Sequence, residues 1–432
     1  MPLPLSDSAA MPAEAYPEKF QRIHGQTFFS RLQANEQTFL QTKAERYRFT
    51  LQELKQLCEI ALDFSMWDEP GLEKIWPQEP EAELGSRALK KRIIQQLQDR
   101  WQQLRDEATQ YPPQSELPAS RKPRLNTIEK ERLGLGYCPV ASPRTRCCNL
   151  MTLDAIENCG FDCSYCSIQS FYHGDRINFD QGFGDKLRAL ELDPEEIYHI
   201  GTGQSSDSLL WGNKHGVLDD LCDFARSHPN VILELKTKSK NVAYLLEHEI
   251  PANILCTWSL NTPTLIAHEE HRTATLDERL AAARKVADRG ILVGFHFHPM
   301  IHYDGWQGEY GEIFQRLVRE FSPQEVALVS LGTLTYTKGV IKQIRGRGHR
   351  SKILQLPLEE ADGKLSYPEP TKLAMFRHAY EGLSPWHDEV FFYLCMENQR
   401  LWRPVFGFDY PTNEDFEAAM KSRYMAKIRG LG

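Results

Sequence analysis

The chain has 432 residues, of which 41% are hydrophobic and 25% are charged, and its formal net charge is −8. These fractions are typical of a folded globular protein, and the acidic balance excludes a general electrostatic attraction to nucleic acid or anionic membranes, so a nucleic-acid partner would need a local basic patch. The sequence contains no run of eighteen apolar residues and no basic, apolar leader, so we expect a cytoplasmic protein without membrane contact.

Residues 1–110 have the pattern of a helical domain. Apolar residues recur every three to four positions among Gln, Glu, Lys and Arg over residues 28–64 and 86–108. A stretch rich in Pro and Ser follows, and we place a linker over residues 111–135. We interpret the helical domain as a structural cap, with binding of a substrate or partner as the alternative.

After the linker, short apolar runs typical of strands alternate with amphipathic helical patterns. The predicted strands are residues 148–158, 195–201, 231–239, 253–261, 291–300 and 325–336. The predicted helices are residues 217–228, 241–250, 276–290 and 310–321. This alternation predicts an α/β domain over residues 136–340 whose parallel sheet carries functional groups at the carboxyl ends of its strands. Six strands suit a partial barrel more than a closed one of eight strands. Residues 341–432 are assigned to a separate C-terminal region.

Three cysteines, Cys159, Cys163 and Cys166, lie within eight residues directly after the first predicted strand. The ten cysteines of the chain are otherwise scattered, so this group indicates a metal or redox site rather than a disulfide framework. Three thiolates can hold three corners of an iron–sulfur cube or of a zinc tetrahedron. A structural zinc site normally has a fourth ligand, for which His173 is the nearest candidate. A [4Fe–4S] cluster held by three cysteines leaves one iron open to a small molecule.

The spacing C-x3-C-x2-C, with Tyr165 before the third cysteine and a strand before the first, resembles the signature of radical S-adenosylmethionine enzymes. Four later blocks, "LKTKSKNVAYLL", "WSLN", "HRTATLDERLAAARKVADRGILVGFHFHPMIHYDGW" and "TLTYTKGVIK", are similar in order and separation to the spore photoproduct lyase family. The resemblance covers residues 148–396 and implies a partial (β/α)6 barrel, with the helical domain and the C-terminal region as additions to it.

The resemblance also implies the chemistry. It assigns a [4Fe–4S] cluster to the three cysteines and S-adenosylmethionine to the open iron, so that one electron produces a 5′-deoxyadenosyl radical. That radical would abstract hydrogen from a nucleic-acid substrate, with a thymine photolesion in DNA and a carbon–carbon lyase reaction as the candidates. An electron donor such as flavodoxin or ferredoxin is implied as a partner.

Site residues carry over from the same blocks. Lysine can pair with the methionine carboxylate, and hydroxyl or amide groups can bind ribose or amine. Two glycines in "GTGQSSDS" allow a close approach of the backbone to a ligand, and Ser206 and Asp207 match an element of the family. Tyr165 is expected to pack over the cofactor and is the candidate catalytic residue. The expected contacts to S-adenosylmethionine are Tyr165, Gly201, Gly203, Ser206, Lys238, Ser259 and Asn261.

Two positions depart from the family pattern. The cysteine that returns hydrogen in the lyase corresponds to Gln204, which stays a candidate substrate contact, and a tyrosine that assists it corresponds to Ser167. Amide and alcohol groups hold hydrogen too strongly to replace a thiol. Either another thiol or the cofactor supplies the hydrogen, or the enzyme acts on another substrate such as RNA or a peptide. A zinc-stabilised binding module without catalysis is the remaining alternative.

The remaining cysteines offer no clear substitute. Cys256 is expected to point away from the pocket, because it is an odd number of strand positions from Ser259. The other three are expected to be buried and inert. These are Cys147, Cys148 and Cys395.

Residues 336–352 form a predicted basic loop that could follow a phosphate backbone, with a solvated charged loop as the alternative. Its cations are Lys338, Lys342, Arg345, Arg347, Arg350 and Lys352, of which Lys338, Arg345 and Arg347 are the candidate substrate contacts. On the fifth strand, His296 and His298 are expected to face one side. With His302 they would suggest a second metal, but histidines of a pocket or core are favoured.

Overall fold

The computed structural model describes residues 15–113, 123–138, 144–168, 176–361 and 363–430. The chain forms two compact units, Met1–Glu107 with Ile341–Gln355 and Ala108–Val340 with Leu356–Gly432. The sequence-based boundaries at 110, 135 and 340 stay a prediction. No helix among the described residues combines the length and apolar character needed to cross a membrane.

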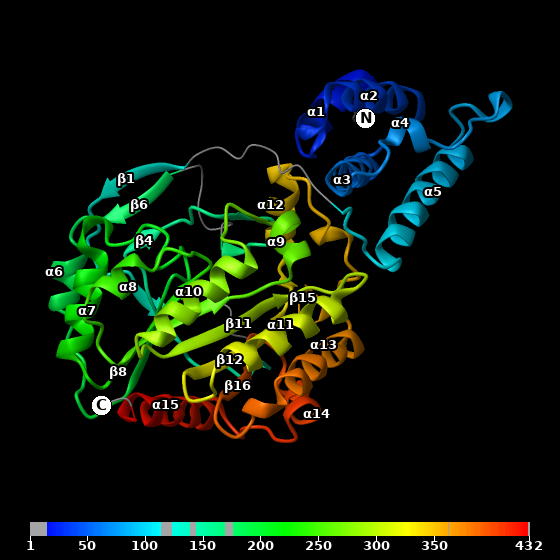
Figure 1. The fold of residues 1–432 in the computed structure, drawn as a ribbon. Coiled ribbons are helices and arrows are strands. Elements are labelled where there is room, and N and C mark those ends of the chain that lie inside the picture. Colours follow the sequence, from blue (N-terminus) through cyan, green and yellow to red (C-terminus); the bar gives the residue numbers. More distant parts are fainter. Residues whose placement is uncertain (1–14, 114–122, 139–143, 169–175, 362, 431–432) are drawn as a thin grey trace, which may run out of the picture. The chain divides into compact units, whose positions relative to one another are not determined.

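The first unit is helical, as the periodicity predicts (blue to cyan in Figure 1). Thr50 begins its central helix with a capping box, in which Thr50 Oγ1 accepts from Glu53 N and Glu53 Oε2 accepts from Thr50 N. The long helix α5 (Arg87–Asp106) packs on it through an apolar face that includes Leu89, Ile93 and Leu97. The helices of this unit before residue 108 are α1 (Tyr16–His24), α2 (Ala34–Tyr47), α3 (Leu51–Trp67), α4 (Leu72–Ile75) and α5 (Arg87–Asp106).

The basic segment at residues 336–352 is largely a helix, α12 (Lys338–Arg347), so the prediction of a loop there is wrong. Its glycines suggested a turn, but apolar residues at helical spacing give it a face on which Ile344 is buried. Arg345 Nε and Nη2 donate to the two carboxylate oxygens of Asp63 in α3, at 2.7 and 2.8 Å. Arg345 therefore has a structural role within the helical unit, which removes it as a candidate phosphate contact.

The second unit is built on an eight-stranded curled sheet in the order β16-β12-β11-β9-β8-β7-β3-β2. All strands except the edge strand β2 are parallel to their neighbours. The six predicted strands are confirmed, and β16 and β2 extend the sheet by one strand at each edge. Bounds are β2 (Leu135–Tyr137), β3 (Met151–Leu153), β7 (Tyr198–Thr202), β8 (Val231–Thr237), β9 (Ile254–Ser259), β11 (Val293–Met300), β12 (Val326–Thr333) and β16 (Phe391–Leu394).

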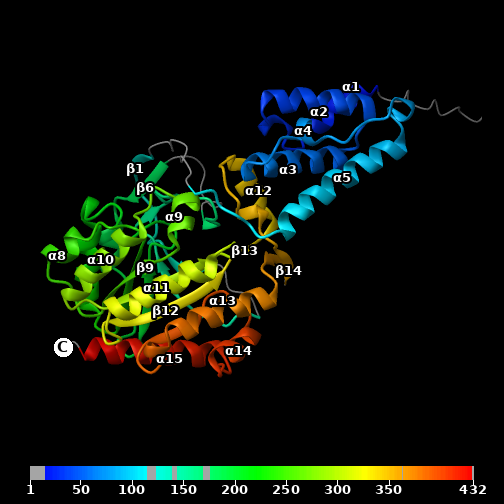
Figure 2. The same ribbon diagram turned by 45° about the vertical axis from the view of Figure 1, so that its right-hand side comes forward.

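Helices between the parallel strands connect them and pack against the sheet, and two further helices follow the last strand (Figure 2). They are α6 (Phe183–Arg188), α7 (Val217–Ser227), α8 (Ala243–Glu247), α9 (Pro263–Glu269), α10 (Leu276–Asp288), α11 (Trp306–Glu320), α13 (Glu369–Gly382), α14 (Trp402–Phe406) and α15 (Asn413–Arg429). Small sheets are formed by β1 (Arg124–Ile128), β6 (Arg176–Asp180) and β4 (Ile156–Glu157), by β5 (Asp162–Cys163) and β10 (Glu270–His271), and by β13 (Thr335–Tyr336), β15 (Lys364–Ser366) and β14 (Glu359–Ala361). Every residue of β9 and β12 is buried, which makes the centre of the sheet the core of this unit.

Two chain segments close the curled sheet on itself, and we call residues 144–149 with 395–399 the seam. The first segment leads into β3, and the second leaves the edge strand β16. Thr145 forms an antiparallel bridge with Asn398, and Gln399 N donates to Arg144 O at 3.0 Å. Arg146 Nη2 donates to Gln399 Oε1 at 2.9 Å. The seam thus joins the two sides of the sheet.

Candidate active site

One cavity of about 250 Å³ lies in the second unit, at the carboxyl ends of the parallel strands. Its walls include Lys238 after β8, Ser259 at the end of β9, and Thr333 at the end of β12. The prediction that functional groups collect at these strand ends is therefore confirmed. The cavity also receives the loop after β3, which carries the three-cysteine motif.

Cys159, Cys163 and Cys166 all line this cavity. Asn158, in a left-handed conformation (φ 68°), accepts at Oδ1 from Cys159 N and donates from Nδ2 to Arg176 O at 3.0 Å, which fixes the start of the loop. A turn with Cys166 N donating to Cys163 O at 3.1 Å follows. Burial raises the pKa of Cys159 and of Cys163, and Asp207 raises that of Cys159 further, as Glu270 does for Cys163. These buried thiols need a cation to lose their protons, as metal coordination provides.

The donor set fits an iron–sulfur cluster better than a zinc ion. Zinc, with Zn–S bonds of about 2.3 Å, gathers its ligands around one point. Within the described ranges, no three side chains of His, Cys, Asp or Glu are arranged to hold a single metal ion. Three thiols that share a cavity without meeting at a point agree with a larger cluster. His173, the candidate fourth zinc ligand, lies outside the described residues.

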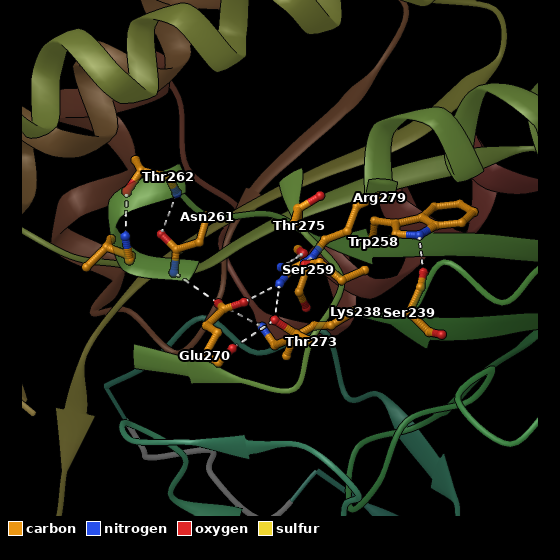
Figure 3. Close-up of polar contacts among 12 residues, drawn as sticks. Lys238, Ser239, Trp258, Ser259, Asn261, Thr262, Glu270, Thr273, Thr275 and Arg279 are labelled. Atoms are coloured by element: carbon orange, nitrogen blue, oxygen red, sulfur yellow. Dashed lines mark hydrogen bonds and ion pairs between the residues drawn. The ribbon is translucent and has the colours of Figure 1, made fainter. Parts of the chain in front are cut away.

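Beside the thiols lies a fully buried carboxylate, Glu270 in β10, whose strand pairs with the cysteine strand β5. Arg279 Nη2 donates to it at 2.5 Å and Asn261 Nδ2 at 3.3 Å, and Lys238 Nζ lies 3.4 Å from it (Figure 3). The Tyr165 hydroxyl also donates to it. Burial alone would raise the pKa of Glu270, but Arg279 and then Lys238 hold that pKa at about 2. Glu270 is therefore ionised and organises the surrounding donors.

Tyr165 and Lys238 are brought together as the sequence predicts. Lys238 Nζ donates to the Tyr165 hydroxyl at 3.1 Å and lies 5.6 Å from the centre of its ring. Tyr336 donates from its hydroxyl to Tyr165 O at 3.1 Å, which fixes the backbone of the cysteine loop. Arg279 Nη1 donates to Ser259 O at 2.8 Å. Glu270 and Arg279 were missed by sequence reasoning, although both lie in the "HRTAT" block or next to it.

The loop after β7 is fastened to β8 by Asp207. This carboxylate accepts from Thr237 Oγ1 at 2.8 Å and from Lys238 N at 2.7 Å, as well as from two backbone amides of its own loop. Gly203 has φ +77°, and a Cβ there would lie 2.6 Å from Lys236 O, so only glycine fits. Gly203, Gln204 and Ser206 line the cavity. This loop can bring its backbone close to a ligand.

The other predicted site residues are placed as follows. Gly201 lies within β7, and Asn261 accepts from the Tyr310 hydroxyl at 2.7 Å, so both support the walls rather than line them. Ser167 lines the cavity, whereas Cys256 is fully buried outside the lining, as strand alternation predicts. Lys338 is exposed near Glu360 at 3.4 Å. Neither Lys338 nor Arg347 lines the cavity.

His296 and His298 both line the cavity, as predicted for one face of β11. His296 Nε2 lies 2.6 Å from Glu234 Oε1, while His199 Nε2 lies 2.9 Å from Glu234 Oε2. Burial, together with Lys236, lowers the pKa of His296 to about 4, although Glu234 opposes this change. His302 instead contacts aromatic rings outside the cavity. His296 and His199 therefore belong to a buried polar network around Glu234.

Four further thiols line the same cavity, and sequence reasoning gave none of them a place there. They are Cys138, Cys147, Cys148 and Cys395. A hydrogen bond from Cys148 lowers the pKa of Cys147 to about 6, against the opposing effect of burial. A lowered pKa favours the reactive thiolate, so Cys147 has less reason to be inert than the other thiols of this group.

Comparison with known proteins identifies the family to which the chain belongs. The family model for spore photoproduct lyase matches residues 153–369. A spore photoproduct lyase of a Geobacillus species is 27% identical over 216 residues, which cover 48% of this chain and 62% of the relative. That of Clostridium acetobutylicum is 23% identical over 181 residues, covering 40% and 53%. The matches thus span less than two thirds of these relatives.

Solved structures give the same fold. A spore photoproduct lyase complexed with dinucleoside spore photoproduct matches with a TM-score of 0.55 and 20% identity, covering 70% of this chain and 94% of that one. A mutant lyase with bound AdoMet and the same dinucleoside matches with a TM-score of 0.54, 20% identity and the same coverage. At this identity the likeness establishes the fold.

Proposed function

The chain belongs to the spore photoproduct lyase family, and on that premise we propose that it is a radical S-adenosylmethionine enzyme that acts on a thymine photolesion in DNA. One observation carries the proposal: three clustered thiols, a lysine and a glycine loop share one cavity. Cys159, Cys163 and Cys166 hold a [4Fe–4S] cluster, and S-adenosylmethionine binds beside it. When bound, these cofactors supply reductive cleavage to a 5′-deoxyadenosyl radical.

The charges of the buried network suit a carboxylate ligand. Glu270 contributes one negative charge, and Arg279 and Lys238 each contribute one positive charge. The group therefore has an excess positive charge, which the methionine carboxylate of the ligand can neutralise. Glu270 and Asp207 hold Lys238 from two sides, through its Nζ and its backbone N. The positioning of this lysine is thus set before the ligand arrives.

The substrate, the reductant and the location are further parts of the proposal. The relative's complex with a dinucleoside photoproduct supports DNA, and the low-potential cluster needs a donor such as flavodoxin or ferredoxin. A reducing cytoplasm suits ten free cysteines.

A second candidate is a radical enzyme of the same fold that acts on RNA or a peptide. The observation that favours it is Gln204, which lines the cavity where the family has its hydrogen-donating cysteine. The zinc-stabilised binding module has less support, since the family match is to an enzyme.

Anaerobic reconstitution followed by incubation with oligonucleotides of defined photolesions tests the proposal, with products identified by mass spectrometry. We expect about four irons per chain, 5′-deoxyadenosine, and restored thymine only from the lesion substrate. Cys163→Ala should lose the iron and both products, whereas Cys222→Ala, a buried thiol outside the cavity, should keep them. If 5′-deoxyadenosine forms but thymine is restored from none of the lesions, the second candidate is favoured.

A further inference from the structure

The cavity holds a second group of thiols, which we call the seam thiols because three of the four lie in the seam: Cys138, Cys147, Cys148 and Cys395. Cys147 and Cys148 lie in one segment of the seam and Cys395 begins the other. Cys147 N donates to Asn413 Oδ1 at 3.0 Å, and Asn149 Nδ2 donates to Glu417 Oε2 at 2.8 Å, so α15 holds the cysteine pair on both sides. The pair has a fixed place in the wall of the cavity.

The two neighbouring thiols differ in their protonation. The side chain of Cys148 lowers the pKa of Cys147, whereas Cys147 and then burial raise the pKa of Cys148. The other groups around them are Glu417, which opposes ionisation of Cys147, and Cys395, which adds to the effect on Cys148. Lys236 and Glu397 lie around Cys395 itself. Cys147 is therefore the thiol of the pair that ionises first, and Cys148 is the one that keeps its hydrogen.

We propose that Cys148 returns the hydrogen atom to the product radical, with Cys147 as its positioning partner. The inference rests on the proposed function. It accounts for the missing hydrogen-atom donor at Gln204. The Gln204 side chain lines the cavity, but its amide holds hydrogen too strongly to donate it. Among the described residues, the seam thiols are the cavity cysteines outside the metal motif, and Cys148 is the one of the adjacent pair whose pKa is raised, so that it keeps its hydrogen.

The step balances in atoms and electrons. The S–H bond of Cys148 breaks and a C–H bond forms on the substrate carbon, which leaves a thiyl radical on Cys148. The thiolate of Cys147 shares the unpaired electron, giving a disulfide radical anion across the two sulfurs. One electron from the low-potential donor that serves the enzyme, with one proton from solvent, restores the thiol and the thiolate. The neighbouring thiolate thus makes loss of the hydrogen atom easier than from an isolated thiol.

The first test reads the thiol pair without turnover. Anaerobic holoenzyme is alkylated with iodoacetamide across a pH series, and the Cys147 peptide is quantified by mass spectrometry. Labelling of Cys147 should rise with a midpoint near pH 6. Cys148→Ala removes the neighbouring thiol and should move the midpoint upward, while Cys222→Ala should leave it in place. A midpoint in the wild type at the ordinary thiol value, about pH 8.5, would overturn the proposal.

The second test follows the hydrogen. With lesion DNA in D₂O, the wild type should place deuterium from the exchangeable thiol on the product. Cys148→Ala should still make 5′-deoxyadenosine. It should restore thymine in the oligonucleotide at least about tenfold less than the wild type and should form by-products of the unquenched radical. Iron content and thermal unfolding confirm that the variant is folded, and Cys222→Ala is the matched control.

The outcomes distinguish an error in the role of Cys148 from an error in the proposed function. The role of Cys148 is overturned if Cys148→Ala restores thymine as fully as the wild type, or if only Cys395→Ala restores less. The proposed function stands in both cases. If the wild type restores thymine from none of the lesions, the proposed function is overturned, and the inference with it.

Discussion

Glu270 and Arg279 form an ion pair whose two side chains have no exposed surface, with Arg279 Nη2 2.5 Å from Glu270 Oε2. The pair joins β10 to α10, and Glu270 contacts both Tyr165 of the cysteine loop and Lys238. It therefore determines both the stability of this region and the position of Tyr165 and Lys238.

Arg279→Met should destabilise the protein strongly. The substitution leaves the Glu270 carboxylate buried without its main partner, and breaking a buried pair from one side costs about 3–5 kcal/mol. Urea unfolding followed by circular dichroism measures the loss. Arg319→Met, at an exposed pair with Glu320, is the control and should change the free energy of unfolding by less than about 1 kcal/mol. Equal effects of the two variants would contradict a special role for the buried pair.

Acid should weaken the same region over a defined pH range. The folded protein holds the pKa of Glu270 at about 2, below its ordinary value of 4.5, because Arg279 and Lys238 outweigh the effect of burial. The unfolded chain takes up this proton at higher pH than the folded chain, so the contribution is complete above about pH 4.5 and is lost on acidification towards pH 2. Unfolding free energies measured across this range should fall less steeply for Glu270→Gln. An identical slope would contradict the assignment.

Lys238→Met should weaken binding of S-adenosylmethionine by about 10- to 100-fold, since a hydrogen bond to a charged group contributes about 1.5–3 kcal/mol. Anaerobic calorimetry on reconstituted protein measures the affinity. Lys240→Met is the matched control, because Lys240 is an exposed lysine two residues away that pairs with Glu278. Unchanged affinity in Lys238→Met would remove this lysine from the cofactor site.

Arg345→Met should loosen α12 without changing the salt dependence of DNA binding. Asp63 is fully buried and also accepts from Trp101 Nε1 at 2.9 Å, so loss of its arginine should cost about 3 kcal/mol. Faster hydrogen exchange in α12 is the expected readout. Arg92→Met, at an exposed pair with Glu83, should leave exchange unchanged. A smaller salt slope for DNA binding would return Arg345 to the substrate contacts.

Adding Gln204→Cys to the Cys148→Ala variant should recover its ability to restore thymine from the lesion. The new thiol would face the same cavity, from the loop fastened by Asp207. Quantification of thymine in the double variant, against Cys148→Ala alone, tests whether any cavity thiol suffices. No rescue would indicate that the thiolate of Cys147 is essential, or that position 204 is out of reach.

Local patterns carried most of what the sequence could predict. The six core strands, the helices between them and the three cysteines follow from periodicity and spacing, which depend on neighbours along the chain. Lys238 and Tyr165 were identified through the resemblance, and their hydrogen bond agrees with a shared site.

What could not be predicted depends on distant contacts. Glu270 and Arg279 have the sequence pattern of surface charges, and only the packing of β10 on β5 removes water from both. Cys148 and Cys395 share a cavity only because the sheet curls and closes. In α12 the glycines outweighed the apolar spacing in the sequence-based interpretation, although burial of Ile344 stabilises the helix.

The seam has a consequence for the order of folding. Its hydrogen bond between Arg146 and Gln399 spans 253 residues of chain. Closing so long a loop costs conformational entropy that local contacts do not offset, so we expect this junction to form late, after the strands have paired. A partly folded chain then has the metal motif before it has the complete set of seam thiols. The reactive sulfurs are gathered only in the finished protein.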